Sequence, residues 1–477
     1  MKILGSAIAH QSAAGKKPTS ASLRAKLLWS AQLALQGPWQ GRLPFRSSAA
    51  IERAQKRRVR DAVSHAYRYV PYYRETMHRL GLGPDDLQTA ADLGRLPVLD
   101  RAELQRDPEY FLSTARPRAE YLKLRTSGTS GRPMTVFRDV HMLFKEAAHG
   151  ERRRAVIMKL AGKRIRYRAV RIETPTSVSI SAARAFEHQS FIPFGVRIVW
   201  RHLSLYDQPA RNVELINEFK PDEIGSYGSY IEALFRYVEE SGVDFHVPRV
   251  VTYGADALSA STRRRLTERF GIEVLSIYGA IEAPSIGFEC EEHLGHHLNV
   301  DLYPIRILDA NEAEVADGES GEVIVSNLVS RGTVLLNYRL GDIASKHPEQ
   351  CPCGRSLPLL SFVEGRIDDW LQGHSGELIH PQAAVKLVAS EEEIWQAQII
   401  QHSPNRFELL VVPAAHCDRH GLRVRLVRSF ADRFGEGTTD VSFVESLPRT
   451  EGGKVRTVIS MRPSGDISGL PVGGLPP

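Results

Sequence analysis

The sequence contains few cysteines and no long apolar run. Only four of its 477 residues are cysteine, which is too few for a fold built on disulfides. No stretch approaches the ~20 uninterrupted apolar residues that a membrane-spanning helix needs. The apolar run in the first ten residues is also too short for a secretory signal. These absences predict a cytoplasmic protein with reduced thiols and no transmembrane segment.

Acidic residues are almost absent from the start of the chain. Residues 1–60 contain twelve Lys or Arg and one acid, Glu52, which gives a net charge of +11. The other 417 residues carry 50 basic and 55 acidic side chains, a net charge of −5. A basic, acid-poor segment suits a membrane surface, a nucleic acid or a targeting signal, and it is also typical of a solvated extension. We favour a partly disordered extension over residues 1–50, with a short helix at 27–35, and expect no nucleic acid partner.

The remaining length predicts more than one domain. From about residue 120, strand-like and helix-like segments alternate, which indicates a mainly parallel sheet with helices on both faces. The expected strands are 168–173, 223–226, 249–253 and 272–277, and the expected helices are 212–218, 230–241 and 261–270.

After residue 300 the segments become shorter and richer in strand, at 304–308, 321–325 and 333–338. We therefore expect an α/β fold with a large domain over residues 51–366, made of mainly parallel sheets flanked by helices plus a β-rich subdomain. A small α+β domain follows over residues 367–462. Residues 463–477 are rich in Pro and Gly and are predicted to be a disordered tail.

The strongest local motif is TSGTSGRP, residues 126–133, which follows a strand-like segment. Small residues let the backbone wrap closely around an anion, and backbone amides and hydroxyls donate to phosphate oxygens. The GK[ST] ending of the kinase-type P-loop is missing. The motif predicts phosphate binding, and a plain surface loop is the alternative.

A second motif, YGAIE at residues 278–282, follows the strand expected at 272–277. Ligands gather at the carboxyl ends of strands in an open α/β sheet. Tyr278 is suited to stack on a base, and Glu282 to hold Mg²⁺ against phosphates, because hard cations prefer oxygen ligands. The alternative is a buried tyrosine beside a surface glutamate.

Each of two further motifs contains one charged side chain that is suited to binding part of a nucleotide. In YRLGD, Asp342 lies just beyond a strand, where a carboxylate can accept hydrogen bonds from two ribose hydroxyls. In PRTEGGK, Lys454 lies on a glycine-rich loop, and a flexible ammonium can neutralise charge in a phosphoryl transition state. A strand-ending turn and a surface lysine are the plain alternatives.

The order of the motifs is more specific than any one of them. TSGTSGRP, YGAIE, YRLGD, GRIDD and PRTEGGK resemble the adenylate-forming superfamily of acyl-CoA synthetases, peptide-synthetase adenylation domains and luciferases. Over residues 55–460 the chain looks most like the phenylacetate–CoA ligase and CapK-type branch. The resemblance implies an enzyme that uses ATP and Mg²⁺ to activate a carboxylic acid, aromatic by analogy, and passes the acyl group to coenzyme A. Transfer to an amine, a hydroxyl or a carrier-protein thiol is an alternative, and a non-catalytic nucleotide-binding relative is another.

The resemblance also implies roles for individual residues. The small C-terminal domain is expected to be mobile and to rotate about Asp368 between the two half-reactions. Lys454 is expected to bind the carboxylate and the α-phosphate, and Glu282 to hold Mg²⁺. Asp342 and Arg366 are expected to hold the ribose. The other expected ATP- or AMP-binding residues are Thr126, Ser127, Gly128, Thr129, Ser130 and Gly131 at the phosphates, and Gly254, Ala255, Asp256, Tyr278, Gly279 and Ala280 beside the adenine.

Three positions depart from the family pattern. Met134 stands where many relatives have lysine, and Ile281 stands in place of the small hydroxyl residue before the metal-binding glutamate. Thr457 stands where relatives have an arginine, with Arg456 one place earlier. These departures put the full activity and the identity of the acceptor in question.

Three cysteines and three histidines fall in two short segments, CEEHLGHH from residue 290 and CPC from residue 351. Zinc favours four such ligands in a tetrahedron. Members of the branch that the chain resembles carry a zinc site in corresponding places, which implies structural zinc, with His293 and His296 as alternative histidines. Reduced cysteines with solvated histidines are the other interpretation. The expected ligands are Cys290, His297, Cys351 and Cys353. A homodimer is among the assemblies we expect.

Overall fold

The computed structural model describes seven stretches of the chain, residues 22–125, 134–191, 198–363, 365–366, 369–373, 377–450 and 452–460. The phosphate-loop residues Thr126, Ser127, Gly128, Thr129, Ser130 and Gly131 lie outside the described residues. So do the expected hinge residue Asp368 and the expected tail at 463–477.

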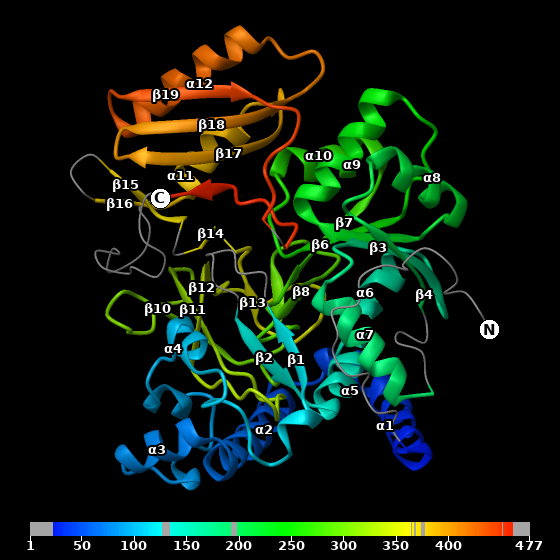
Figure 1. The fold of residues 1–477 in the computed structure, drawn as a ribbon, viewed down its shortest axis with the longest axis vertical. Coiled ribbons are helices and arrows are strands. Elements are labelled where there is room, and N and C mark those ends of the chain that lie inside the picture. The colour runs from blue at the N-terminus through cyan, green and yellow to red at the C-terminus, as the bar shows by residue number, and fades with distance from the viewer. Residues whose placement is uncertain are drawn as a thin grey trace.

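A mixed eight-stranded sheet forms the centre of the large domain (Figure 1). Its order is β13-β9-β8-β7-β6-β5-β3-β4. Strands pair in parallel from β7 through β6, β5 and β3 to β4, and antiparallel from β7 to β13. The strands are β3 Tyr167–Glu173, β4 Ile198–Ser204, β5 Glu223–Tyr227, β6 Val250–Gly254, β7 Glu273–Tyr278, β8 Gly287–Glu289, β9 His296–Leu298 and β13 Leu359–Leu360.

Helices alternate with the parallel strands, as the sequence pattern predicts. All of the strands and helices expected between residues 168 and 277 are present, with shifts of a few residues at their ends. Helix α9 shows why they form, because Ile231, Leu234 and Phe235 share one buried face and Gly242 ends the helix at φ +61°. The helices are α5 Val140–His149, α6 Glu151–Leu160, α7 Val178–Gln189, α8 Pro209–Phe219, α9 Gly228–Ser241 and α10 Ala260–Phe270.

A second, antiparallel sheet has the order β10-β11-β12-β14 and forms the β-rich part of the large domain. The strand expected at residues 333–338 is wrong, because β12 begins only at Tyr338. Asn337 has φ +58°, a left-handed conformation that interrupts extended backbone. The strands are β10 Ile305–Leu308, β11 Ser320–Val325, β12 Tyr338–Ser345 and β14 Gly365–Arg366, and a separate antiparallel pair is formed by β1 Leu122–Arg125 and β2 Thr135–Arg138.

The N-terminal region is more ordered than predicted. The short helix expected at residues 27–35 extends over α1, Leu23–Arg42. The Trp29 ring stacks on Phe144 with 4.9 Å between centroids, which joins α1 to α5. Residues 22–50 therefore pack on the large domain, so the part of the expected, partly disordered extension that the structure describes is ordered and mainly helical. The other helices here are α2 Ser48–Tyr69, α3 Pro71–Arg79 and α4 Arg101–Arg106, with 3₁₀ turns at Leu43–Phe45, Pro84–Asp86, Asp92–Arg95 and Arg118–Glu120.

The small domain has its own core, built around Phe407, Phe430 and Phe434. Its sheet has the order β19-β18-β17-β20, with helices α11 and α12 packed against it. The predicted α/β class with a small α+β C-terminal unit is thereby confirmed. Among the described residues no helix is long and apolar enough to cross a membrane. The elements are β15 Leu371–Gln372, β16 Leu378–Ile379, α11 Gln382–Ala389, β17 Ile394–Ser403, β18 Arg406–Pro413, α12 Arg419–Phe434, β19 Thr438–Phe443 and β20 Val458–Ile459.

Candidate active site

Asp256 lies just after the carboxyl end of β6 and connects three segments. Ala255 takes φ +71°, which turns the chain out of the strand, and the Asp256 carboxylate accepts from the backbone N–H of Ser229 at 3.2 Å and from its hydroxyl at 2.6 Å. Gly254 is needed at the turn, because a β-carbon there would lie 2.9 Å from the carbonyl oxygen of Ile277. Burial raises the pKa of Asp256, and the hydrogen bonds from Ser229 oppose that shift.

Tyr278 and Asp342 meet between the two sheets of the large domain. The Tyr278 hydroxyl donates to the Asp342 carboxylate at 3.0 Å, and the Tyr278 ring packs at a tilt against His296. Asp342 pairs in register with Arg366 across β12 and β14, and their side chains lie 3.9 Å apart. The two residues expected at a ribose are therefore neighbours.

Glu282 is buried beside a tyrosine from the second sheet. Its carboxylate accepts from the Tyr338 hydroxyl at 3.2 Å, and its backbone carbonyl accepts from the side chain of Asn327 at 2.7 Å. The preceding Gly279 and Ala280 form a tight turn, in which the Ala280 N–H donates to the carbonyl of Ala283 at 2.9 Å. The turn aims a buried carboxylate into the same region as Asp342.

Lys454 reaches this region from the small domain. The backbone N–H of its neighbour Val455 donates to Asp256 at 3.1 Å, which fixes the loop against the large domain. Burial lowers the pKa of Lys454, and the positive charge of Arg366 lowers it further, whereas the carboxylates of Asp256, Asp342 and Glu282 act to raise it. The structure thus brings Lys454 within electrostatic reach of every charged residue predicted for the site and described here.

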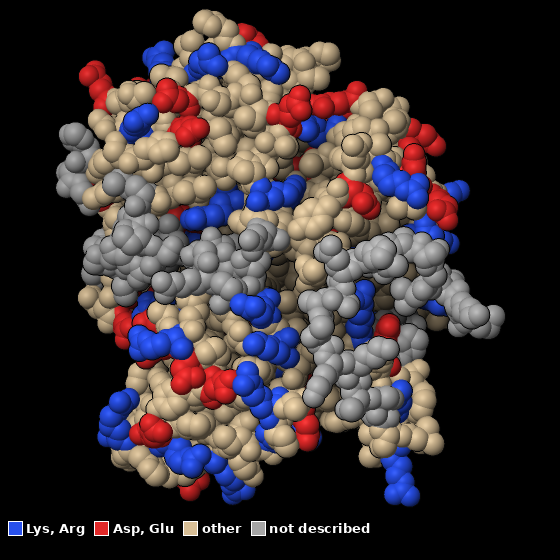
Figure 2. All heavy atoms as spheres, viewed as in Figure 1, with Lys and Arg blue, Asp and Glu red and all other residues tan. Residues whose placement is uncertain are grey.

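Arg449 anchors the Lys454 loop. Its guanidinium donates to the Ser229 hydroxyl at 2.8 Å and to the Gly453 carbonyl at 2.8 Å. From β17, the Gln396 amide donates to the Ser229 carbonyl at 2.8 Å and to Glu232 at 2.9 Å. Blue side chains lie along the junction of the two domains on the face drawn in Figure 2. The small domain is therefore docked through directional polar contacts.

The three departures from the family pattern all have structural partners. Met134 is fully buried, and its sulfur lies 3.6 Å from the Tyr338 hydroxyl oxygen, so an uncharged side chain stands at this position. The Ile281 carbonyl accepts from the Arg138 side chain at 2.8 Å. The Thr457 carbonyl accepts from the N–H of Ile399 within the small-domain sheet at 2.8 Å. Arg456, one place earlier, forms an ion pair with Asp369 at 2.9 Å.

The cysteine cluster gathers four possible metal ligands in one place. The ligand atoms of Cys290, His297, Cys351 and Cys353 lie within 4.8 Å of one another. The Sγ atoms of Cys290 and Cys351 are 3.6 Å apart, and Sγ of Cys353 is 3.2 Å from Nε2 of His297. Zn–S bonds of about 2.3 Å in a tetrahedron would place two sulfurs about 3.8 Å apart, so the spacing fits that ion.

Hydrogen bonds distinguish the three candidate histidines. Nδ1 of His297 faces the carbonyl of Leu357 at 3.2 Å, which leaves Nε2 directed at Cys353. His293 instead lies 2.8 Å from Glu289, and His296 lies 2.9 Å from the Ser276 hydroxyl. His297 is thus the histidine that the structure brings to the thiols.

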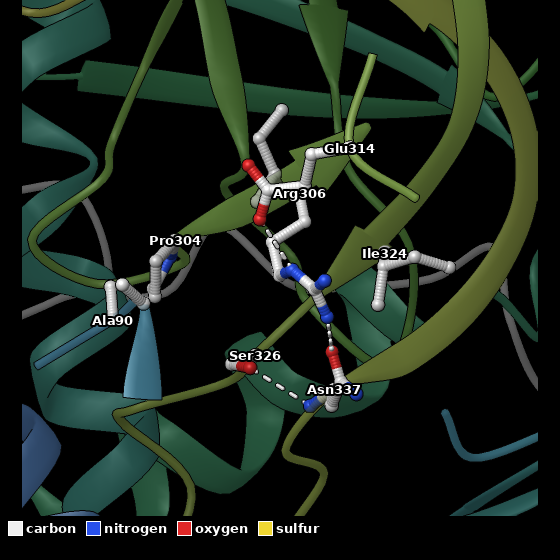
Figure 3. Close-up of a pocket in the computed structure, with 9 residues that line it drawn as sticks. Ala90, Pro304, Arg306, Glu314, Ile324, Ser326 and Asn337 are labelled. Atoms are coloured by element: carbon white, nitrogen blue, oxygen red, sulfur yellow. Dashed lines mark hydrogen bonds and ion pairs between the residues drawn. The ribbon is translucent and has the colours of Figure 1, made fainter. Parts of the chain in front are cut away.

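A pocket of about 160 Å³ lies apart from these residues (Figure 3). Arg306 is its cation, and it already bonds to Glu314 at 2.6 Å and to Asn337 at 3.1 Å. Ala90, Pro304 and Ile324 supply apolar walls, so we assign no chemistry to this pocket.

Sequence reasoning did not single out three residues of the site, Ser229, Tyr338 and Arg449. Arg449 and Tyr338 lie inside motifs that were used for a single neighbouring charge. Ser229 follows the strand expected at 223–226, at the sheet edge where ligands gather. Position relative to the strand ends was therefore the available signal. The partners themselves are distant in sequence, 56 positions apart for Tyr338 and Glu282 and 220 positions apart for Arg449 and Ser229.

Comparison with known proteins gives two matches along the chain. The AMP-binding enzyme family matches residues 102–332, and the CapK C-terminal domain family matches residues 371–461. Among curated proteins, the phenylacetate-coenzyme A ligase of Thermus thermophilus is 26% identical over 440 residues, covering 86% of this chain and 96% of that protein. The Aromatoleum evansii ligase of the same name is 28% identical over 335 residues, covering 68% and 72%.

Solved structures share the fold. A 2-hydroxyisobutyryl-CoA ligase in its postadenylation state superposes with a TM-score of 0.72 at 19% identity, covering 88% of this chain and 92% of that one. The same ligase in its thioesterification state, with an adenylate and CoA bound, superposes with a TM-score of 0.58 at 20% identity, covering 88% and 91%.

Proposed function

Because the chain belongs to the adenylate-forming superfamily, in its phenylacetate–CoA ligase and CapK-like branch, we propose that it converts a carboxylic acid and ATP into an acyl adenylate and then into an acyl-CoA thioester. The observation that carries this proposal is the position of Lys454. Its loop comes from the small domain and is docked on the large one, because the N–H of the next residue, Val455, donates to Asp256 at 3.1 Å. The carboxylates of Glu282 and Asp342 in the large domain act to raise the pKa of Lys454.

In the first half-reaction a carboxylate oxygen attacks the α-phosphorus of ATP and pyrophosphate leaves. The protein itself forms no bond to the substrate in this step, so it accelerates the reaction by positioning the reactants and neutralising charge. We assign Asp342 and Arg366 to the ribose and Lys454 to the negative charge that grows between the carboxylate and the α-phosphate. A partly desolvated ammonium interacts more strongly with an anion than a fully hydrated one does.

We assign Mg²⁺ to Glu282, whose hard carboxylate oxygens suit that cation. When bound, the ion would neutralise charge on the phosphates. Tyr338 holds one oxygen of Glu282 through its hydroxyl and so fixes the direction of the carboxylate.

In the second half-reaction the thiol of coenzyme A loses its proton and attacks the acyl carbon, and AMP leaves. We propose that the Lys454 loop first withdraws by rotation of the small domain about Asp368. The polar contacts of Arg449, Gln396 and Val455 can exchange with water, so the docked arrangement can open without loss of a hydrophobic core. We assign the reaction to the cytoplasm, where both ATP and coenzyme A are available.

We further propose that Cys290, His297, Cys351 and Cys353 hold a structural zinc ion. Three thiols and one imidazole form a closed set, with no position left for a reacting water, as is typical of structural sites. The ligands lie between β8, β9 and β13 at the end of the large sheet, where an ion would join a loop to the strands.

The test is pyrophosphate release from ATP and Mg²⁺ across a panel of aryl and alkyl acids, with and without coenzyme A. We expect acid-dependent release and a thioester product only when coenzyme A is present. Lys454→Ala should lower the release rate about 10²- to 10³-fold, whereas Lys386→Ala, an exposed lysine on α11, should leave it unchanged. Product formation without coenzyme A, in the presence of an amine, would reassign the acceptor. No release with any acid would contradict the adenylation itself.

A further inference from the structure

The outward face of α1 is unusually apolar. Four leucines on it are 56% to 79% exposed, and Trp39 is 43% exposed. Small apolar residues fill the spaces between them, and the only charged residues on this face are two arginines. The exposed residues of α1 are Leu23, Arg24, Leu27, Leu28, Ala31, Ala34, Leu35, Pro38, Trp39 and Arg42.

The inward face of α1 combines the Trp29 ring and Leu33 with several polar contacts. Gln40 is buried and accepts two hydrogen bonds from the buried guanidinium of Arg152, at 2.7 and 3.1 Å. Gly37 is buried against Glu151, and the Ser30 hydroxyl lies 3.1 Å from that of Ser190. A helix that packs only on its own domain turns its leucines inward. In α1 four of the five leucines face outward instead, which indicates that the outward face has an apolar partner of its own.

The charged residues of α1 itself are all basic. Helix α1 contains no acidic residue, and Arg24, Lys26 and Arg42 are spread along it. The first 60 residues together carry a net charge of +11. Phe191 extends the apolar surface beside α1, since it is 53% exposed, its N–H donates to Ser30 at 3.1 Å and its ring lies 5.7 Å from the Lys26 ammonium.

We propose that the outward face of α1 docks on an anionic lipid surface. Leucine and tryptophan side chains bounded by arginine and lysine are the composition of helices that lie in a membrane interface. A second copy of this chain fits less well, because two such faces would bring Arg24 and Arg42 of both copies together. A nucleic acid would leave the leucines in water.

The position of α1 in the fold is compatible with such docking. In Figure 1, α1 lies at the end of the molecule opposite the small domain, and in Figure 2 the projecting corner that it forms carries blue and tan atoms. A lipid surface bound there leaves the small domain free to rotate. The enzyme would then work at a membrane face with its nucleotide site in water.

The test is flotation of the full chain with two kinds of vesicle, phosphatidylcholine alone and phosphatidylcholine with about one third phosphatidylglycerol. We expect binding to the anionic vesicles, and weaker binding at high salt as the charges are screened. Leu28→Ser combined with Leu35→Ser should lower the bound fraction at least about tenfold. The matched control is Val424→Ser combined with Leu294→Ser, two exposed apolar residues elsewhere, which should bind like the unchanged protein.

Trp39 provides a local readout. Its fluorescence should be quenched by brominated lipid, and Trp39→Phe should remove that part of the quenching. Equal thermal midpoints of both double variants would show that the fold is intact. The proposal is overturned if the unchanged protein does not float with anionic vesicles, or if both double variants float equally. It is also overturned if sedimentation velocity without lipid shows a dimer that the Leu28/Leu35 variant dissociates, since the occupant is then a second copy.

Discussion

The proposed nucleotide site and the cysteine cluster differ in how they are assembled. The nucleotide site combines Asp256, Glu282 and Asp342 of the large domain with Lys454 of the small one. It is held by hydrogen bonds that cross the domain junction, such as the one from Val455 to Asp256. The cysteine cluster draws all four ligands from the large domain, and three of them are buried.

This difference matches the chemistry assigned to each site. An adenylating enzyme that also makes a thioester has to place a lysine and later withdraw it, so the lysine belongs on a separately folded unit. A structural metal has no such requirement and is most useful where it joins segments permanently. Variants of the two sites should therefore fail in different ways, one in stability and the other in rate.

Loss of a cysteine ligand should give the largest effect. If the cluster holds zinc as proposed, Cys290→Ser should release the ion and lower the free energy of unfolding by on the order of 5 kcal/mol, a part of the ~10–16 kcal/mol that structural zinc contributes in small zinc peptides. Cys417→Ser is the control, because Cys417 lies outside the cluster. Metal analysis and urea unfolding measure both quantities. Equal stability of the Cys290→Ser and Cys417→Ser variants would contradict a structural metal at the cysteine cluster.

Among the residues assigned to catalysis, we expect Glu282→Gln to lower the adenylation rate without changing stability. Glutamine keeps the shape and the contact with Tyr338 and removes the charge that would hold Mg²⁺, so adenylation should fall about 10²-fold, or about 3 kcal/mol. The unfolding midpoint should stay that of the unchanged protein. Glu268→Gln, an exposed glutamate on α10, is the control. An unchanged rate over a range of Mg²⁺ concentrations would take Glu282 out of the metal site.

Arg449→Ala should separate the two half-reactions. Ser229 would lose its hydrogen bonds from the guanidinium, which weakens docking of the small domain by about 2 kcal/mol, or about 30-fold. Adenylation needs the docked arrangement and should slow by that factor, whereas thioester formation from added acyl adenylate should not. Arg428→Ala, exposed on α12, serves as the control. Equal slowing of both half-reactions would argue against a docking role.

The sequence predicted the central sheet well because its strands and helices follow simple periodicities. The prediction of element boundaries was wrong in two places, where the conformation of one residue ends a strand and where the apolar face of a helix does not pack on the core. The φ of Asn337 shortened a strand that looked regular. The extent of α1 was underestimated because four of its five leucines face away from the core, so they form no inward apolar stripe.

Site residues were predictable to different degrees for a related reason. Glu282 follows β7, and the sheet topology alone brings strand ends together. Asp342 lies inside β12 and not just beyond a strand as predicted, because the strand begins only at Tyr338. The docking role of Asp256 depends on Val455, 199 positions away, and no local pattern encodes that contact. His297 was the ligand expected from the sequence, with His293 and His296 as alternatives, and the hydrogen bonds of each ring together with its place beside the thiols support that choice.

The smallest effect is expected from Glu232, whose burial at the domain junction makes the stability of the protein depend on pH. Burial raises the pKa of Glu232 to about 7, and its carboxylate accepts from Ser259 and Gln396. The folded protein therefore holds a proton on Glu232 up to about pH 7, whereas the unfolded chain releases it near pH 4.5, so stability from this group falls as the pH rises between those values. Glu232→Gln should remove that loss and gain on the order of 1–2 kcal/mol over the unchanged protein at pH 8, with little difference at pH 4.5. The gain in stability stays below the full value expected from the pKa shift, because the small domain can move away and return the Glu232 carboxylate to water.

Urea unfolding of both proteins from pH 4.5 to 8 measures this difference in stability. A difference that stays constant with pH would place the ionisation of Glu232 outside the domain junction.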